Sequence, residues 1–281
     1  MEIRKTKVIG FCGGVRRAIK MAEDNPGAYI AAGEIVHNPH ETARLLRDFD
    51  VGPLEIDAIP NGGTALIRAH GIGEAEQKSM EARGIKIIDA TCPNVKRVQD
   101  LAREFSESGR AVFLFGETNH PEVLGIIGRA ANVFAFSSVD QLRGIALPER
   151  VALISQTTKP INEFQEAEKF LSEKIKDFQS VCTICPATQN NQKAAAELAK
   201  WADIMIVIGG KNSSNTKALA AAAGPFCQDI FQVENAAELR PEWFDGKQHC
   251  AIAAGLSTPD YSIEEVESAI ARFLPPFMGA G

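Results

Sequence analysis

The feature of this 281-residue chain that most constrains its fold is a pattern that occurs three times along it. In each copy a short apolar run leads to a cysteine, a Gly or Pro follows directly, and a helical pattern begins. The three cysteines are Cys12, Cys92 and Cys185. Because the same pattern recurs in order, we expect three copies of one α/β unit, each of which supplies one cysteine.

Each copy continues with two polar turns, and each turn follows an apolar run. The first turn places a polar residue four positions after a glycine, and these residues are His37, His120 and Ser213. The second turn closes the copy, and its polar residues are His70, Thr157 with Thr158, and Ser257. In parallel α/β sheets, ligands bind at the carboxyl ends of the strands. If the three copies face a common axis, the cysteines and polar turns converge on one cavity.

The apolar runs are short and β-branched, and helical patterns alternate with them, which is typical of parallel α/β structure. The expected strands are 7–11, 29–36, 65–69, 86–90, 111–115, 133–136, 151–155, 204–208 and 251–254. The expected helices include 95–108, 163–175, 187–202 and 263–273. The strand before each cysteine belongs either to its own copy or to the sheet of the preceding one.

Three thiolates at matched positions predict an iron–sulfur site, because thiolates are soft ligands and a helix N-terminus lowers a thiol pKa. Three protein ligands leave one metal position open for a substrate. An isolated cysteine is more often a small buried apolar residue, and this interpretation holds for Cys182, Cys227 and Cys250, which have no repeat counterparts. Cys182 and Cys185 also form a C-x-x-C pair, which is compatible with a redox pair or half a zinc site.

The fold class is therefore α/β, with three similar α/β domains in pseudo-threefold arrangement around a central cluster site. The expected domains are 13–92, 93–185, and 186–281 together with 1–12.

The polar turns have the residue types of an anion site. Histidines at matched strand ends can ligate a metal or donate hydrogen bonds to an anion. The segment 212–215, Asn-Ser-Ser-Asn, precedes a helix and is compatible with helix capping and with phosphate binding alike. Glu122 is the acidic residue inside the marked turns; it is either an ordinary first-turn carboxylate or a proton donor. Thr157 or Thr158 would then hold the proton or a water.

Composition excludes several function classes. The net charge is −6 and the basic residues are scattered, so we expect no nucleic-acid partner. No run of 18 apolar residues and no signal-peptide pattern occurs, so we expect no membrane association and a cytoplasmic location. Thiols in such a chain stay reduced, which favours metal binding or catalysis over disulfides.

The chain resembles the 4-hydroxy-3-methylbut-2-enyl diphosphate reductase family over nearly its whole length. The motifs that carry the resemblance, in order, are GFCGGV, VHNP, RAHG, DATCP, HPEV, SQTT, ICPATQNNQ, KNSSN and GLSTP. The resemblance implies a [4Fe–4S] cluster on Cys12, Cys92 and Cys185, and reduction of a small allylic diphosphate to isopentenyl and dimethylallyl diphosphates. It also implies an external electron donor of the ferredoxin or flavodoxin type.

The resemblance assigns roles to single residues. It implies Glu122 as the proton donor, Thr157 as its hydroxyl partner, and His120 beside them. The substrate-binding residues that it implies are His37, His70, His120, Thr157, Ser213, Ser214, Asn215 and Ser257.

Three other functions stay open from the residues themselves. A non-redox iron–sulfur hydratase or dehydratase would need no stoichiometric reductant. An iron–sulfur or zinc sensor without turnover would lack a converging acid and anion pocket. A thiol–disulfide protein that uses Cys182 and Cys185 would be colourless and indifferent to the loss of Cys12.

Overall fold

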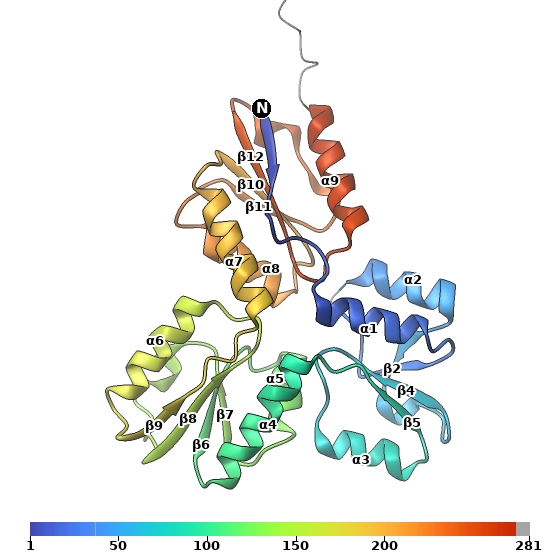
Figure 1. Ribbon diagram of the computed structural model, residues 1–281, viewed down its shortest axis with the longest axis vertical. Helices are drawn as coiled ribbons and strands as arrows, with labels where there is room; N and C mark the ends of the chain where they lie inside the picture. Colours follow the sequence, from blue (N-terminus) through green and yellow to red (C-terminus); the bar gives the residue numbers. More distant parts are fainter. Residues whose placement is uncertain (37, 274–281) are drawn as a thin grey trace, which may run out of the picture. The chain divides into compact units, whose positions relative to one another are not determined.

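The computed structural model describes residues 1–36 and 38–273, and they form two compact units (Figure 1). The terminal unit joins residues 1–12 to those from 186 onward, and the inner unit comprises residues 13–185. The terminal unit contains one four-stranded sheet and the inner unit contains two. All the strand pairs in these sheets are parallel.

The terminal unit has one sheet with the strand order β1-β12-β10-β11. Its strands are β1 (Glu2–Lys5), β10 (Ile204–Ile208), β11 (Ile230–Val233) and β12 (His249–Ala254). Its helices are α7 (Pro186–Ala199), α8 (Ser214–Ala223) and α9 (Asp260–Phe273), with the short 3₁₀ helices η3 (Ala236–Glu238) and η4 (Pro241–Phe244). The N-terminal strand thus completes a sheet whose other strands come from the C-terminal part of the chain.

The inner unit has two sheets with the orders β3-β2-β4-β5 and β7-β6-β8-β9. The first contains β2 (Tyr29–Ala31), β3 (Gly52–Leu54), β4 (Thr64–Ile67) and β5 (Lys86–Asp89), with α1 (Gly13–Glu23), α2 (Pro39–Phe49), α3 (Glu74–Ala82) and η1 (Ile56–Ala58). The second contains β6 (Ala111–Phe115), β7 (Val133–Phe136), β8 (Arg150–Ser155) and β9 (Asp177–Ser180), with α4 (Pro93–Glu107), α5 (Pro121–Ile127), α6 (Ile161–Ser172) and η2 (Val139–Leu142).

All three sheets are covered by helices on both faces, which explains why their central strands are continuously apolar. In β10, Ile204, Ile206 and Ile208 pack toward α9, whereas Met205 and Val207 pack toward α7 and α8. The second inner sheet follows the same rule, with α6 on one face and α4 and α5 on the other. The strand ends that carry the polar turns therefore extend beyond well-packed cores.

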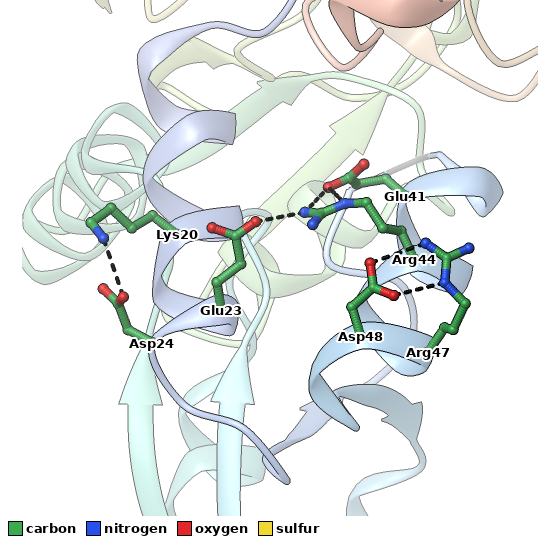
Figure 2. Close-up of polar contacts among 7 residues, drawn as sticks. All are labelled: Lys20, Glu23, Asp24, Glu41, Arg44, Arg47 and Asp48. Carbon is green, nitrogen blue, oxygen red and sulfur yellow. Dashed lines mark hydrogen bonds and ion pairs between the residues drawn. The ribbon is translucent and has the colours of Figure 1, made fainter.

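Helices α1 and α2 are joined by an ion-pair network that Figure 2 shows. The Arg44 guanidinium on α2 donates to Glu41 at 2.5 Å and to Glu23 on α1 at 2.7 Å. The Glu41 side chain is only 3% exposed, and Arg44 is the cation that pairs with it. The pairs Lys20–Asp24 and Arg47–Asp48, also drawn in Figure 2, lie at the exposed surface.

The two sheets of the inner unit are held together where a turn of the first meets α5 of the second. The N–H of Glu74 donates to the Gly128 carbonyl at 3.0 Å, and a Cβ added to Gly128 would lie 2.7 Å from the Cα of Gly73. Arg129 donates to the Ile72 carbonyl at 3.0 Å. This contact places the turn that carries His70 against the helix that carries Glu122.

The alternation of strands and helices predicted from the sequence is confirmed, and the four predicted helices begin and end within three residues of their predicted bounds. The strand predicted at 7–11 is wrong. The strand is Glu2–Lys5, and the segment that follows is irregular, with a positive φ of 79° at Gly10. The strand predicted at 29–36 ends at Ala31, because Ala32 and Gly33 have positive φ.

Three strands were not predicted: β3, β9 and β11. They are only three or four residues long, and β3 and β9 contain no β-branched residue, so their signal is weak. The fourth strand of each sheet, β1, β5 or β9, leads directly toward a repeat cysteine, so the strand before each cysteine belongs to the preceding copy. The expected domain boundaries at Cys92 and Cys185 stay predictions. In the part of the chain that the structure describes, no helix has the length and apolarity needed to cross a membrane.

Candidate active site

A buried carboxylate lies at the start of α5. His120 is the N-cap of this helix, Pro121 occupies its first position, and Glu122 follows with 1% of its surface exposed. Thr157, in the turn after β8, donates its backbone N–H to Glu122 Oε1 at 2.6 Å and its hydroxyl to Oε2 at 2.8 Å. Burial raises the pKa of Glu122 to about 7, although both hydrogen bonds from Thr157 act to lower it. The carboxyl can therefore hold or release a proton near neutral pH.

Two histidines lie together near the start of α5. The rings of His70 and His120 meet edge to face, with centroids 5.4 Å apart. His120 Nδ1 accepts the backbone N–H of Glu122 at 3.1 Å. A nitrogen that accepts a hydrogen bond carries no proton, so the neutral His120 ring has its N–H at Nε2. The neutral form of His120 can thus donate a hydrogen bond from Nε2 to an anion.

The cysteines of the inner unit, Cys92 and Cys185, lie near each other. Asn94, two residues after Cys92, donates its side-chain N–H to the Sγ of Cys185 at 3.0 Å. Cys92 is the N-cap of α4, and Cys185 directly precedes α7. Helix N-termini and an N–H donor both favour a negatively charged sulfur.

Cys12 lies in the terminal unit and has the same backbone environment as the other two. Its N–H donates to the carbonyl of Leu256 at 3.1 Å, as that of Cys92 donates to Ala69 at 3.0 Å and that of Cys185 to Thr157 at 2.9 Å. Each acceptor is the second residue after β12, β4 or β8, the strand that pairs with the edge strand preceding the cysteine. The three cysteines therefore occupy equivalent positions in three equivalent sheets.

The exposure of the thiols separates the repeat cysteines from two others. Cys12, Cys92 and Cys185 are half-buried, whereas Cys227 and Cys250 are buried. Burial raises the pKa of Cys227 and raises that of Cys250 to about 12, so both stay as thiols. Cys182 is exposed.

The N-terminus of α8 in the terminal unit collects buried polar groups. Ser213 is the N-cap and accepts the N–H of Thr216 at 3.4 Å. Ser214 and Asn215 follow and are buried. Both polar atoms of the Asn215 amide are shielded from water and have no hydrogen-bond partner among the described residues. Because a buried amide without partners is costly, Asn215 indicates a ligand-binding position.

The predicted site residues are divided between the units. The inner unit brings together His70, Cys92, His120, Glu122, Thr157 and Cys185. The terminal unit contains Cys12, Ser213, Ser214, Asn215 and Ser257. His37 lies outside the described residues. Within residues 1–36 and 38–273, no group of three or more His, Cys, Asp or Glu is placed to hold a metal ion.

Two residues at the site were not predicted. Asn94 contacts Cys185, and its place two residues after a repeat cysteine was the signal that could have identified it. Arg68 opens the turn of His70, and its Nε is buried without a partner among the described residues.

The chemistry of the three repeat thiols is compatible with an iron–sulfur cluster. The three repeat thiols are half-buried at helix N-termini, and Cys185 Sγ already accepts an N–H of the kind that hydrogen-bonds to cluster sulfurs.

Comparison with known proteins places the chain in a family. The sequence pattern described as LytB protein matches residues 3–271. The chain is 45% identical over 267 residues to the 4-hydroxy-3-methylbut-2-enyl diphosphate reductase of a Nitratiruptor species, which covers 95% of this chain and 97% of that protein. It is 43% identical over 274 residues to the reductase of the same name from Campylobacter concisus, at 97% and 100% coverage.

Solved structures agree with these relatives. One described as (E)-4-hydroxy-3-methyl-but-2-enyl diphosphate reductase, the terminal enzyme of the non-mevalonate pathway, is 36% identical, with a TM-score of 0.70 and coverage of 96% of this chain and 99% of that one. The E-1-hydroxy-2-methyl-but-2-enyl-4-diphosphate reductase of Plasmodium falciparum has a TM-score of 0.89 at 24% identity and coverage of 98% and 89%, and it supports the fold alone. The resemblance seen in the motifs is thus confirmed, and the chain belongs to the LytB protein family.

Proposed function

We infer that this chain is a 4-hydroxy-3-methylbut-2-enyl diphosphate reductase, which removes the allylic hydroxyl of its substrate and forms isopentenyl and dimethylallyl diphosphates, the last step of the non-mevalonate pathway. Relatives 41% to 45% identical over nearly the whole chain carry this name. The single structural observation that carries the inference is the buried Glu122–Thr157 pair, which lies in the same unit as Cys92 and Cys185.

We propose that Cys12, Cys92 and Cys185 hold a [4Fe–4S] cluster. Their equivalent backbone positions and partial exposure support this set, and the buried Cys227 and Cys250 are poor candidates. When bound, such a cluster would pass electrons from an external donor to the substrate and, with three protein ligands, would leave one iron open.

Glu122 delivers the proton in this proposal. Its pKa of about 7 leaves a large fraction protonated at neutral pH, and Thr157 fixes both carboxyl oxygens. A positioned acid with a pKa near the working pH transfers protons efficiently. Two electrons and two protons enter, and the hydroxyl leaves as water.

Each unit contains hydrogen-bond donors suited to binding a diphosphate. In the inner unit His70 and His120 lie together, and the Nε2–H of His120 is a suitable donor. In the terminal unit, the buried amide of Asn215 lacks a partner among the described residues, and the start of α8 offers backbone N–H groups and a favourable dipole. The full proposed set is His37, His70, His120, Thr157, Ser213, Ser214, Asn215 and Ser257.

Electrons would come from an external donor, a ferredoxin or flavodoxin, because the sequence has no nucleotide-cofactor fingerprint. We propose a cytoplasmic location, in keeping with the half-buried and exposed thiols that a reducing compartment preserves.

The experiment that tests this function is anaerobic purification followed by iron, sulfide and electron counting. We expect about four irons per chain, and turnover of the allylic diphosphate that consumes two reducing equivalents per product. Conversion that proceeds without reductant would instead identify a dehydratase or hydratase. A cluster-loaded protein that leaves the substrate unchanged in the presence of reductant would indicate a sensor, and a colourless protein would remove the cluster proposal.

A further inference from the structure

Arg68 lies between the two polar turns of the first inner sheet. It follows the last residue of β4 and begins the turn that contains His70, which is closed by a 3.0 Å hydrogen bond from the Gly71 N–H to the Arg68 carbonyl. Its guanidinium extends to the turn after β2, where a Cβ added to Gly33 would lie 2.9 Å from Nη1. Gly33 therefore leaves the room that the guanidinium fills.

The guanidinium is incompletely bonded. Its Nε–H is shielded from water and has no hydrogen-bond partner among the residues that the structure describes. Burial lowers the pKa of Arg68, whereas the negative charges of Glu76, Glu55 and Glu34 act to raise it. The Glu76 carboxylate is already engaged with the N–H of Gly73 at 2.7 Å. A shielded N–H on a cation is costly until an acceptor takes it.

The proposed substrate-binding residues supply no permanent positive charge, because they are imidazoles, hydroxyls and an amide. A diphosphate carries several negative charges, and a guanidinium is the side chain whose paired N–H groups best match phosphate oxygens. Arg68 provides such a group at the carboxyl end of β4, two residues before His70. In a parallel sheet this is the edge where ligands bind.

We propose that Arg68 is a further substrate-binding residue, whose guanidinium takes a phosphate oxygen of the diphosphate beside the turns of Gly33 and His70. This proposal rests on the proposed function, since it names the cation of that same site. It predicts that Arg68 contributes to affinity and little to the chemical step, because the allylic hydroxyl is distant in the substrate from the phosphates.

The test is the binding of inorganic pyrophosphate to the anaerobically purified protein, measured by calorimetry at low and high salt, together with KM and kcat for the allylic diphosphate. The variants are Arg68→Gln and Arg68→Lys. The matched control is Arg47→Gln, which removes the same charge from the exposed surface of α2 in the same unit.

We expect Arg68→Gln to weaken pyrophosphate binding and raise KM at least tenfold, with kcat within about threefold, as for the loss of one charge-assisted hydrogen bond. Arg68→Lys should restore part of the affinity, Arg47→Gln should stay within twofold, and Arg68→Gln should lose part of the salt dependence. Pyrophosphate affinity within twofold of the parent in Arg68→Gln overturns the proposal. If pyrophosphate binding depends on Arg68 but the allylic diphosphate is not reduced, the proposed function fails and the anion site stands.

Discussion

Thr157 holds both oxygens of Glu122, with its backbone N–H 2.6 Å from Oε1 and its hydroxyl 2.8 Å from Oε2. Hydrogen bonds to a carboxylate favour the charged form, whereas exclusion of water favours the neutral one. Here burial is the larger effect, and the pKa of Glu122 rises to about 7. The residue is therefore poised between acid and base, which is the property that a proton donor requires.

The first prediction concerns turnover. Since Glu122 loses its proton as the pH rises through about 7, we expect kcat to fall on the alkaline side of that value. Glu122→Gln cannot deliver a proton and should lower kcat by about 10²- to 10⁴-fold with the iron content unchanged. The measurement is the pH profile of kcat beside an iron assay, with Glu107→Gln on the exposed face of α4 as control. Full turnover in a cluster-loaded Glu122→Gln variant would remove the proton-delivery role.

The second prediction concerns stability. Because the folded-state pKa of Glu122 is raised from 4.5 to about 7, its stabilising contribution is complete below the unfolded pKa and is lost as the pH rises through about 7. Glu122→Gln stays neutral, so its free energy of unfolding relative to that of the parent should increase between pH 5 and pH 8. Thermal midpoints measured at each pH would show this increase. The gain is at most about 3 kcal/mol, from about 1.4 kcal/mol per pKa unit. A constant difference across this range would show that Glu122 is not kept neutral by burial.

The repeat in the sequence predicted much of the fold, because a parallel α/β sheet needs long apolar strands in its centre and these are easily recognised. The central strands β6 and β10 were predicted with their observed bounds. The edge strands β3 and β9 were not predicted, because they are short and have sequences such as DFQS. Pairing with a neighbour, rather than local preference, makes these segments strands.

The site was predictable to the extent that it repeats. The equivalence of Cys12, Cys92 and Cys185 in sequence reappears in their backbone hydrogen bonds. The place of Asn94 two residues after a repeat cysteine could have marked it as a site residue, but not its partner, because the contact with Cys185 joins residues 91 positions apart. The raised pKa of Glu122 depends likewise on burial by distant elements, which the residues around it in the sequence do not reveal.

The third prediction concerns the thiols and iron removal. After a chelator has removed iron, we expect alkylation of Cys12, Cys92, Cys182 and Cys185, whereas Cys227 and Cys250 should resist because burial raises their pKa. With iron bound, the three repeat cysteines should also resist alkylation, whereas the exposed Cys182 should still react. Mass spectrometry of labelled peptides distinguishes these states. Iron-dependent protection of Cys182, with Cys185 labelled, would show that the ligand in the third copy was wrongly chosen.

The last prediction concerns the network between α1 and α2 (Figure 2). Arg44 is the cation that neutralises the buried Glu41, and it also reaches Glu23 on the neighbouring helix. Arg44→Met leaves a carboxylate that is 3% exposed without its partner, so we expect a loss of about 2 kcal/mol in the free energy of unfolding. Arg47→Met removes a cation that is 72% exposed, so the free energy of unfolding should stay almost unchanged, because water already screens this ion pair.

The comparison is made by chemical denaturation of both variants at the same pH and ionic strength. Because α1 begins directly after Cys12 and α2 directly after Asn38, loosening this contact should also speed iron loss to a chelator in Arg44→Met but not in Arg47→Met. Equal stability of the two variants would mean that Glu41 finds another hydrogen-bond donor. Equal iron loss, with the stability difference intact, would mean that the helix pair is anchored independently of the cysteine turn.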